Sequence, residues 1–297
     1  MKPGRRGFGY LPDLPSVKDY VPATPAVANL VNKATSRSLA GGMTASKSGA
    51  AAKTALATRV DLREFCSPIE DQGELGSCTA NASAGLVEYF ERRAFGKYID
   101  ASRLFIYKAT RNLLGYTGDS GAYLRSAMEA LTLFGAPPEE YWPYDVSQFD
   151  VEPSAFLYAL GASYQATKYF RLDPNGVAAT DALGNMKSYL AAGYPSMFGF
   201  PVYDEYMHVP ADGKVALPGQ NSKEYGGHAN VAVGYDDMQD IGGDKGALLV
   251  RNSWGTDWGL DGYAWMSYRY VTEGLATDWW SLVDQKWVDT GNFAVPQ

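Results

Sequence analysis

The hydrophobic pattern changes its period near Pro195, and this change limits the folds open to the chain. Before that point, apolar residues recur at helical spacing in four stretches, residues 79–95, 102–115, 120–138 and 181–195. After it the pattern approaches alternation, in segments that begin near residues 194, 228, 246, 262 and 278 and are separated by turns rich in Gly and Asp. Helices followed by strands predict an α+β fold of two packed lobes.

The first 57 residues differ in composition from the rest of the chain. Residues 24–57 are rich in Ala, Ser, Thr, Gly and Lys and contain no aromatic residue and no Asp or Glu. Such a stretch buries little surface, which favours a linker. We therefore expect an N-terminal segment over residues 1–57 and a folded domain over 58–297, with a mainly helical lobe at about 58–165 and a mainly β lobe at about 166–297.

Charge is divided unevenly between these two parts. The N-terminal segment holds eight Lys or Arg and two Asp, a net of +6, which leaves −13 on residues 58–297 of a chain whose net charge is −7. A basic segment can dock on an acidic body, although a solvated tail has the same composition. The acidic body argues against nucleic acid as the main partner. We expect a monomer. We also expect it to lie in the cytoplasm without a membrane partner, because neither a membrane span nor a secretory signal pattern is visible, although export by another route stays open.

Few residues in the chain can carry nucleophilic or acid–base chemistry. The only cysteines are Cys66 and Cys78, which leaves no CxxC metal motif, and the only histidines are His208 and His228. His208 lies in a polar loop and is expected to face solvent. His228 follows a Gly pair at the start of a Val-rich strand, where it can either point into a cleft or serve the structure.

Cys78 follows a Gly-rich turn at the start of a predicted helix and is either a nucleophile or a small buried hydrophobe. Three other residues suggest a site around it. Asn252 ends an apolar strand and therefore needs a polar partner. Trp254 can cover that partner. Gln72 lies on the turn before the helix, where its amide can donate to a developing oxyanion.

The motifs QGELGSC, GGHANVAVGY and NSWGTDWGLDGY, in this order, resemble those of the papain family of cysteine peptidases. The resemblance runs from about Val60 to about Val283, and the histidine follows the cysteine by 150 residues, as in papain-like enzymes. It implies a two-lobe fold in which a helical lobe carries the cysteine, an antiparallel β-barrel-like lobe carries the histidine and asparagine, and a cleft lies between them. It also implies an endopeptidase acting on peptides or proteins, without cofactor or metal.

The same resemblance assigns roles in a thiol mechanism. Cys78 and His228 are expected as a thiolate–imidazolium pair that forms an acyl-enzyme. Asn252 would orient the imidazole, and Trp254 would shield that contact. Gln72 and the Cys78 backbone N–H would hold the oxyanion.

Two family positions differ in this chain. Leu75 stands where the family has a disulfide cysteine, and Thr79 stands where it has an aromatic residue. Neither change removes a proton-transfer or oxyanion role. Cys66 is expected to be a free, buried thiol, with a redox switch through a Cys66–Cys78 disulfide as the alternative.

Substrate-binding residues follow from the resemblance alone. Gly121 and Ala122 match the strip that pairs with the substrate backbone. Leu124, Ala229 and Asp278 fall near the pocket for the second residue before the scissile bond. With Asp278 at its end, this pocket is expected to accept Arg as well as bulky apolar residues.

The N-terminal segment suggests a second hypothesis. Because family members are usually made with an inhibitory prosegment, we expect residues within 1–57 to lie in or beside the cleft and to depress activity. Two other functions remain open: a binding protein on the same fold that has lost hydrolysis, and a thiol acyltransferase or amidase.

Overall fold

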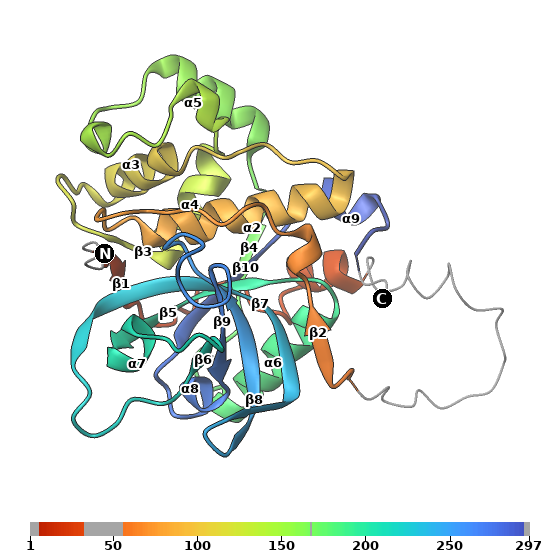
Figure 1. Cartoon of the computed structure of the whole chain (residues 1–297). Coiled ribbons are helices and arrows are strands. Elements are labelled where there is room, and N and C mark those ends of the chain that lie inside the picture. Colours follow the sequence, from red (N-terminus) through yellow and green to blue (C-terminus); the bar gives the residue numbers. More distant parts are fainter. Residues whose placement is uncertain (1–5, 33–55, 167, 294–297) are drawn as a thin grey trace, which may run out of the picture.

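The structure, a computed structural model, describes residues 6–32, 56–166 and 168–293. The helices of residues 78–161 gather on one side of the molecule, and the large sheet lies on the other, together with the helices of residues 179–207 and 269–272 (Figure 1). The named α-helices are α2 (Cys78–Phe95), α3 (Arg103–Leu114), α4 (Leu124–Leu133), α5 (Ala155–Gly161), α6 (Ala179–Ala191), α7 (Asp204–Met207), α8 (Arg269–Thr272) and α9 (Gln285–Asp289). The strands are β1 (Tyr10–Leu11), β2 (Arg59–Asp61), β3 (Ala122–Tyr123), β4 (Lys168–Arg171), β5 (Ser196–Tyr203), β6 (Lys214–Val215), β7 (Glu224–Ile241), β8 (Asp244–Arg251), β9 (Tyr263–Ser267) and β10 (Thr277–Val283).

Helix α2 is the centre of the helical lobe. Most of its side chains are buried, because it packs against α3 and α4 and also against β7 of the sheet. It ends at Gly96, whose φ of 71° is the left-handed conformation that favours glycine at this position. α2 therefore lies between the two lobes (Figure 1), and Cys78 is its first residue.

The sheet holds eight strands in the order β4-β10-β5-β7-β8-β9-β6, with β2 added beside β7. Neighbours are antiparallel except β6 and β9, which are parallel. Its longest strand, β7, pairs with β5 on one side and β8 on the other, so that the residues at its start and those at the end of β8 lie close together. The predicted α+β fold of two lobes is confirmed.

The helix bounds differ from the sequence prediction in one place that matters for the site. The stretch 120–138 becomes helical only at Leu124, because residues 122–123 form the short strand β3. Strand β3 pairs in parallel with β1 of the N-terminal segment, Tyr10 opposite Ala122 and Leu11 opposite Tyr123. These two strands lie side by side at the junction of the lobes (Figure 1).

The predicted linker falls mainly on residues 33–55, which lie outside the described part of the chain. Residues 25–32, at its start, are helical, and Val27 is fully buried. Within the described ranges, no helix has the length and apolar character needed to cross a membrane.

Candidate active site

Cys78 is the first residue of α2 and is completely buried. The turn before it contains Gly76, and the first backbone N–H groups of a helix have no partner within the helix, so they give this end a partial positive charge. The backbone N–H groups of Gly9 and Ala229 lie beside the thiol and lower its pKa. Ala229 follows His228 directly, so the sulfur lies against the part of β7 that carries the histidine.

His228 lies near the start of β7, opposite Phe200 of β5, and is fully buried. Its Nε2 lies 2.8 Å from the side-chain oxygen of Asn252, the residue after β8. Its Nδ1 makes no hydrogen bond to any described residue. Asn252 therefore fixes the ring through one nitrogen and leaves the other available for proton transfer.

Trp254 covers this histidine. The two rings lie 4.5 Å apart between centroids, and Tyr206 packs edge-on against the tryptophan at 5.3 Å. Both aromatic rings exclude water from the His228–Asn252 hydrogen bond. A hydrogen bond in such a low-dielectric setting is stronger electrostatically than one in water.

Gln72 joins the two lobes. Its backbone N–H donates to the carbonyl of Ser253 at 2.9 Å, and its side-chain oxygen accepts from the Ser253 hydroxyl at 2.6 Å. Its amide nitrogen donates to the carbonyls of Leu75, at 2.9 Å, and Gly7, at 3.2 Å. The amide that the sequence assigns to an oxyanion therefore already binds a carbonyl of the N-terminal segment.

The protonation of the Cys78–His228 pair reflects its burial. Loss of water raises the pKa of the Cys78 thiol to about 11. It lowers the pKa of His228 to about 4, with the Asn252 hydrogen bond acting in the opposite direction and the nearby Arg6 charge adding to the decrease. The covered site thus holds a neutral thiol and a neutral imidazole. The thiolate–imidazolium pair stays a prediction for a site open to water.

Residues 6–10 of the N-terminal segment lie along this site and contact residues of both lobes. The Arg6 guanidinium lies 4.6 Å from the centroid of the Trp254 ring, and the Gly7 N–H donates to the Gly73 carbonyl at 3.0 Å. The Gly9 carbonyl accepts from the Ala122 N–H at 2.7 Å. The side chain of the next residue, Tyr10, is buried.

Glycines make this close approach possible. A Cβ on Gly9 would lie 1.7 Å from the carbonyl oxygen of Gly76, and one on Gly7 would lie 2.1 Å from that of Leu75. On the other side, Gly121 has a φ of 71°, and a Cβ there would lie 2.4 Å from the Gly9 oxygen. The segment Gly7–Phe8–Gly9 can therefore lie directly against the backbone of the helical lobe, because side chains at Gly7 and Gly9 would collide with it.

The predicted subsite residues lie in two groups. Gly121 and Ala122 contact Gly9, and Ala229 contacts Cys78, as described above. Leu124, the first residue of α4, is fully buried. Asp278 is also fully buried, but its carboxylate is paired within the protein.

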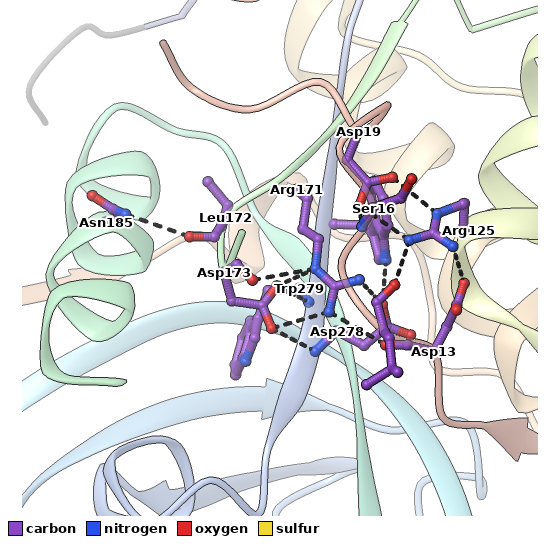
Figure 2. A network of polar contacts seen from close by, with 12 residues as sticks. Asp13, Ser16, Asp19, Arg125, Arg171, Leu172, Asp173, Asn185, Asp278 and Trp279 are labelled. Atoms are coloured by element: carbon purple, nitrogen blue, oxygen red, sulfur yellow. Dashed lines mark hydrogen bonds and ion pairs between the residues drawn. The ribbon is translucent and has the colours of Figure 1, made fainter. Parts of the chain in front are cut away.

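The partner of Asp278 is Arg171 of β4. The Arg171 Nη1 lies 3.0 Å from the Asp278 Oδ1, which also accepts from the Trp280 indole N–H at 2.7 Å (Figure 2). The carboxylate that was expected to bind a substrate arginine is thus already paired with a cation of the protein, and its role toward substrate stays a prediction. Sequence reasoning missed this partner, which lies 107 positions earlier in the chain.

A second arginine holds the N-terminal segment further along. Arg125 of α4 forms ion pairs with Asp13 and Asp19, the latter at 3.0 Å, and donates to the carbonyl of Leu14 at 2.8 Å (Figure 2). The charge pattern pointed to basic residues of the segment docking on an acidic body, whereas these ion pairs have the opposite polarity. The signal in the sequence was that Asp13 and Asp19 are the only acids in residues 1–57.

The remaining predicted positions are structurally simple. Leu75 and Thr79 are buried, and the Leu75 carbonyl anchors the Gln72 amide. Cys66 is buried, and neither cysteine forms a disulfide. His208 is exposed.

Comparisons with known proteins agree with this geometry. The model of the papain family of cysteine proteases matches residues 56–280. A peptidase C1-like protein of Acanthamoeba polyphaga mimivirus is 38% identical over 71% of this chain and 68% of its own length, and a cathepsin B-like protein of Giardia intestinalis is 31% identical over 68% and 66%.

Solved structures extend the comparison to the whole chain. Xylellain, a cysteine protease from Xylella fastidiosa, has a TM-score of 0.71 and 32% identity, covering 95% of this chain and 97% of its own. Bromelain from Ananas comosus, at 22% identity and a TM-score of 0.56, shows the shared fold over 77% of this chain and 99% of its own. The chain belongs to the papain family of cysteine proteases, a family of peptide hydrolases.

Proposed function

We propose that this protein is a cysteine endopeptidase that works through Cys78 and His228 and is inhibited by its own N-terminal segment. The observation that carries the proposal is the meeting of Cys78, His228, Asn252 and Gln72 at one junction, with Gly7 and Gly9 in contact with that junction. Acyl transfer needs a nucleophile at a helix start, a base, a group that orients the base, and an oxyanion donor, and these four residues can fill those roles in this order.

The proposed reaction uses these groups in two stages, formation of an acyl-enzyme and its hydrolysis. The Cys78 thiol gives its proton to His228, the sulfur attacks the peptide carbonyl, and the oxyanion accepts hydrogen bonds from the Gln72 amide and the Cys78 backbone N–H. His228 then protonates the leaving amine, so the C–N bond breaks and an acyl-enzyme remains. A water molecule, deprotonated by His228, hydrolyses the thioester and releases the thiol.

The contacts of the segment argue that it blocks this reaction by covering the oxyanion donor and the thiol with two different peptide groups. In a productive complex, the carbonyl whose oxygen binds the oxyanion donors has its carbon at the sulfur. Here the Gln72 amide binds the carbonyl of Gly7, whereas the thiol faces the N–H of Gly9, a different peptide group. The segment therefore covers both the oxyanion donor and the thiol with its own backbone.

The segment also favours the inactive protonation state. Burial raises the pKa of Cys78 to about 11 and lowers that of His228 to about 4, which opposes thiolate formation near neutral pH. Water admitted by the departure of the segment would reduce both shifts. Inhibition therefore has a steric part and an electrostatic part.

The test is covalent labelling combined with turnover. A vinyl-sulfone peptide should label Cys78 stoichiometrically, more slowly in the full chain than in a variant whose segment is displaced, and Cys78→Ala should abolish it. A Phe-Arg amide should be hydrolysed in parallel. Labelling without turnover would favour the acyltransferase or amidase, and failure of labelling in the displaced variant would favour the binding protein.

A further inference from the structure

The side chain of Tyr10 fills a narrow pocket between strands of the β lobe. Only 6% of Tyr10 is exposed. A Cβ on Gly199 of β5 would lie 2.0 Å from the ring, and one on Gly227 of β7 would lie 3.2 Å from it. Because Gly199 pairs with Ala229, this is the pocket that the sequence assigned to the second residue before the scissile bond. Its walls fit a flat ring.

The acid at this pocket is fixed by the protein itself. Asp278 has a φ of 62°, a left-handed conformation that is uncommon outside glycine. The Asp173 carboxylate holds this turn by accepting the N–H groups of Asp278, at 2.7 Å, and Trp279, at 2.9 Å. The Asp278 side chain is thereby directed to Arg171, whose Nε also binds Asp173 at 3.0 Å (Figure 2).

We propose that Arg171 is a specificity-determining residue: by pairing with Asp278 it leaves the Tyr10 pocket without an unpaired negative charge, so the pocket takes an aromatic substrate side chain and rejects arginine. This inference rests on the proposed function, because it treats Tyr10 as the occupant of a substrate pocket. A guanidinium that reached Asp278 would meet Arg171 within contact distance, and two like charges at a buried site repel each other strongly.

A neutral hydrogen-bond donor meets no such repulsion. The second oxygen of Asp278, Oδ2, is buried and has no hydrogen-bond partner among the described residues, and the hydroxyl of Tyr10 is in the same condition. Burial raises the pKa of the Tyr10 hydroxyl and the Asp278 charge adds to the increase, so the two groups lie near enough to interact. The pocket therefore suits phenylalanine and tyrosine alike.

The first experiment measures the pocket in the full chain and needs no catalysis. Thermal unfolding is compared for wild type, Tyr10→Phe, Tyr10→Ala and Tyr10→Arg. We expect Tyr10→Phe to unfold near the wild-type Tm, and Tyr10→Arg to unfold at or below the Tm of Tyr10→Ala. A Tyr10→Arg protein as stable as wild type would overturn the proposal. An unchanged Tm in Tyr10→Ala would also overturn it, since Tyr10 would then not fill the pocket.

The second experiment measures selectivity in a full-length Gly9→Ala variant, whose segment is expected to leave the cleft. We expect Phe-Arg and Tyr-Arg amides to be cleaved with kcat/KM at least about tenfold higher than an Arg-Arg amide. Adding Arg171→Gln should reduce this ratio, whereas adding Asp278→Asn should not lower the Arg-Arg value selectively. Equal cleavage of all three amides would overturn the inference, as would a selective loss of Arg-Arg cleavage in Asp278→Asn.

The two experiments separate this inference from the proposed function. If Gly9→Ala hydrolyses no amide and its Cys78 is not labelled, the proposed function fails, while the Tm series still decides whether the pocket accepts arginine. If amides are hydrolysed and Arg-Arg is the preferred one, only the specificity inference fails.

Discussion

The side-chain amide of Gln72 donates a hydrogen bond to the carbonyl oxygen of Gly7 at 3.2 Å, across 65 positions of sequence. A donor suited to a transition-state oxyanion is thus occupied by a ground-state carbonyl of the same chain. The Gly9 N–H lies beside the Cys78 thiol at the same time, so the segment covers both of these groups. The predictions below test the parts of this arrangement separately.

The fit of the segment should depend on Gly9. In Gly9→Ala, the new Cβ would lie 1.7 Å from the backbone oxygen of Gly76, which cannot move away as a flexible side chain can. We expect the variant to hydrolyse a Phe-Arg amide about tenfold faster or more, since 1.4 kcal/mol of lost segment binding is enough for that factor. The matched control is Gly184→Ala on α6, where a Cβ meets nothing within 4 Å. Equal activity of both variants and wild type would contradict autoinhibition.

The anchor at Arg125 should control how often the segment leaves. In Arg125→Met, Asp13 and Asp19 lose their cation, and loss of one partner of a partly buried pair is strongly destabilising. We expect Cys78 to be labelled several times faster and the Tm to fall. Arg269→Met is the control, because its ion pairs with Asp244 and Glu273 lie on the exposed surface of the β lobe. Slow labelling in both variants would show that the anchor does not limit opening.

The oxyanion role of Gln72 can be separated from its structural role. In the Gly9→Ala background, Gln72→Ala should lower kcat by about 10²-fold, the typical cost of removing one oxyanion donor. Ser253→Ala removes only the 2.6 Å hydrogen bond to the Gln72 side-chain oxygen and leaves the donor in place. Its loss should be much smaller. Similar losses in the two variants would indicate that Gln72 acts only by holding the lobes together.

Acid should weaken the covered state through His228. Burial lowers the pKa of His228 to about 4, from an ordinary value of 6.5. The open state therefore binds a proton more readily, and stability of the covered state should be lost as pH falls from about 6.5 toward 4, by up to about tenfold in the closing equilibrium per pH unit. In a Cys78→Ala protein, hydrogen exchange of the Ala122 amide, which donates to Gly9, reports this equilibrium.

The matched variant for this measurement is Cys78→Ala combined with His228→Gln, which keeps a polar side chain but does not titrate. Its exchange protection at Ala122 should depend less on pH over the same range. If the pH dependence of the two proteins coincides, another group beside the segment, such as Asp278, whose pKa burial raises to about 7, accounts for the opening instead.

The sequence by itself determined the family and the α+β fold, and it singled out the residues with reactive chemistry. Each of these signals is local: a helix that starts at Cys78, a strand that starts near His228, and an apolar strand that ends at Asn252. With two cysteines and two histidines in 297 residues, few combinations were possible. The catalytic roles of these residues and of Gln72 stay predictions.

Only the tertiary structure decided which charges are free and which are paired. The sequence assigned Asp278 to the end of a substrate pocket, but the direction of its carboxylate depends on a left-handed backbone that Asp173 holds and on Arg171 from a distant strand. Similarly, net charge suggested how the segment docks, whereas the contacts use Asp13 with Arg125, 112 positions away. Composition records how many charges a chain carries, but the energy of each charge depends on burial and on its nearest neighbours, and these are fixed only when the lobes pack together.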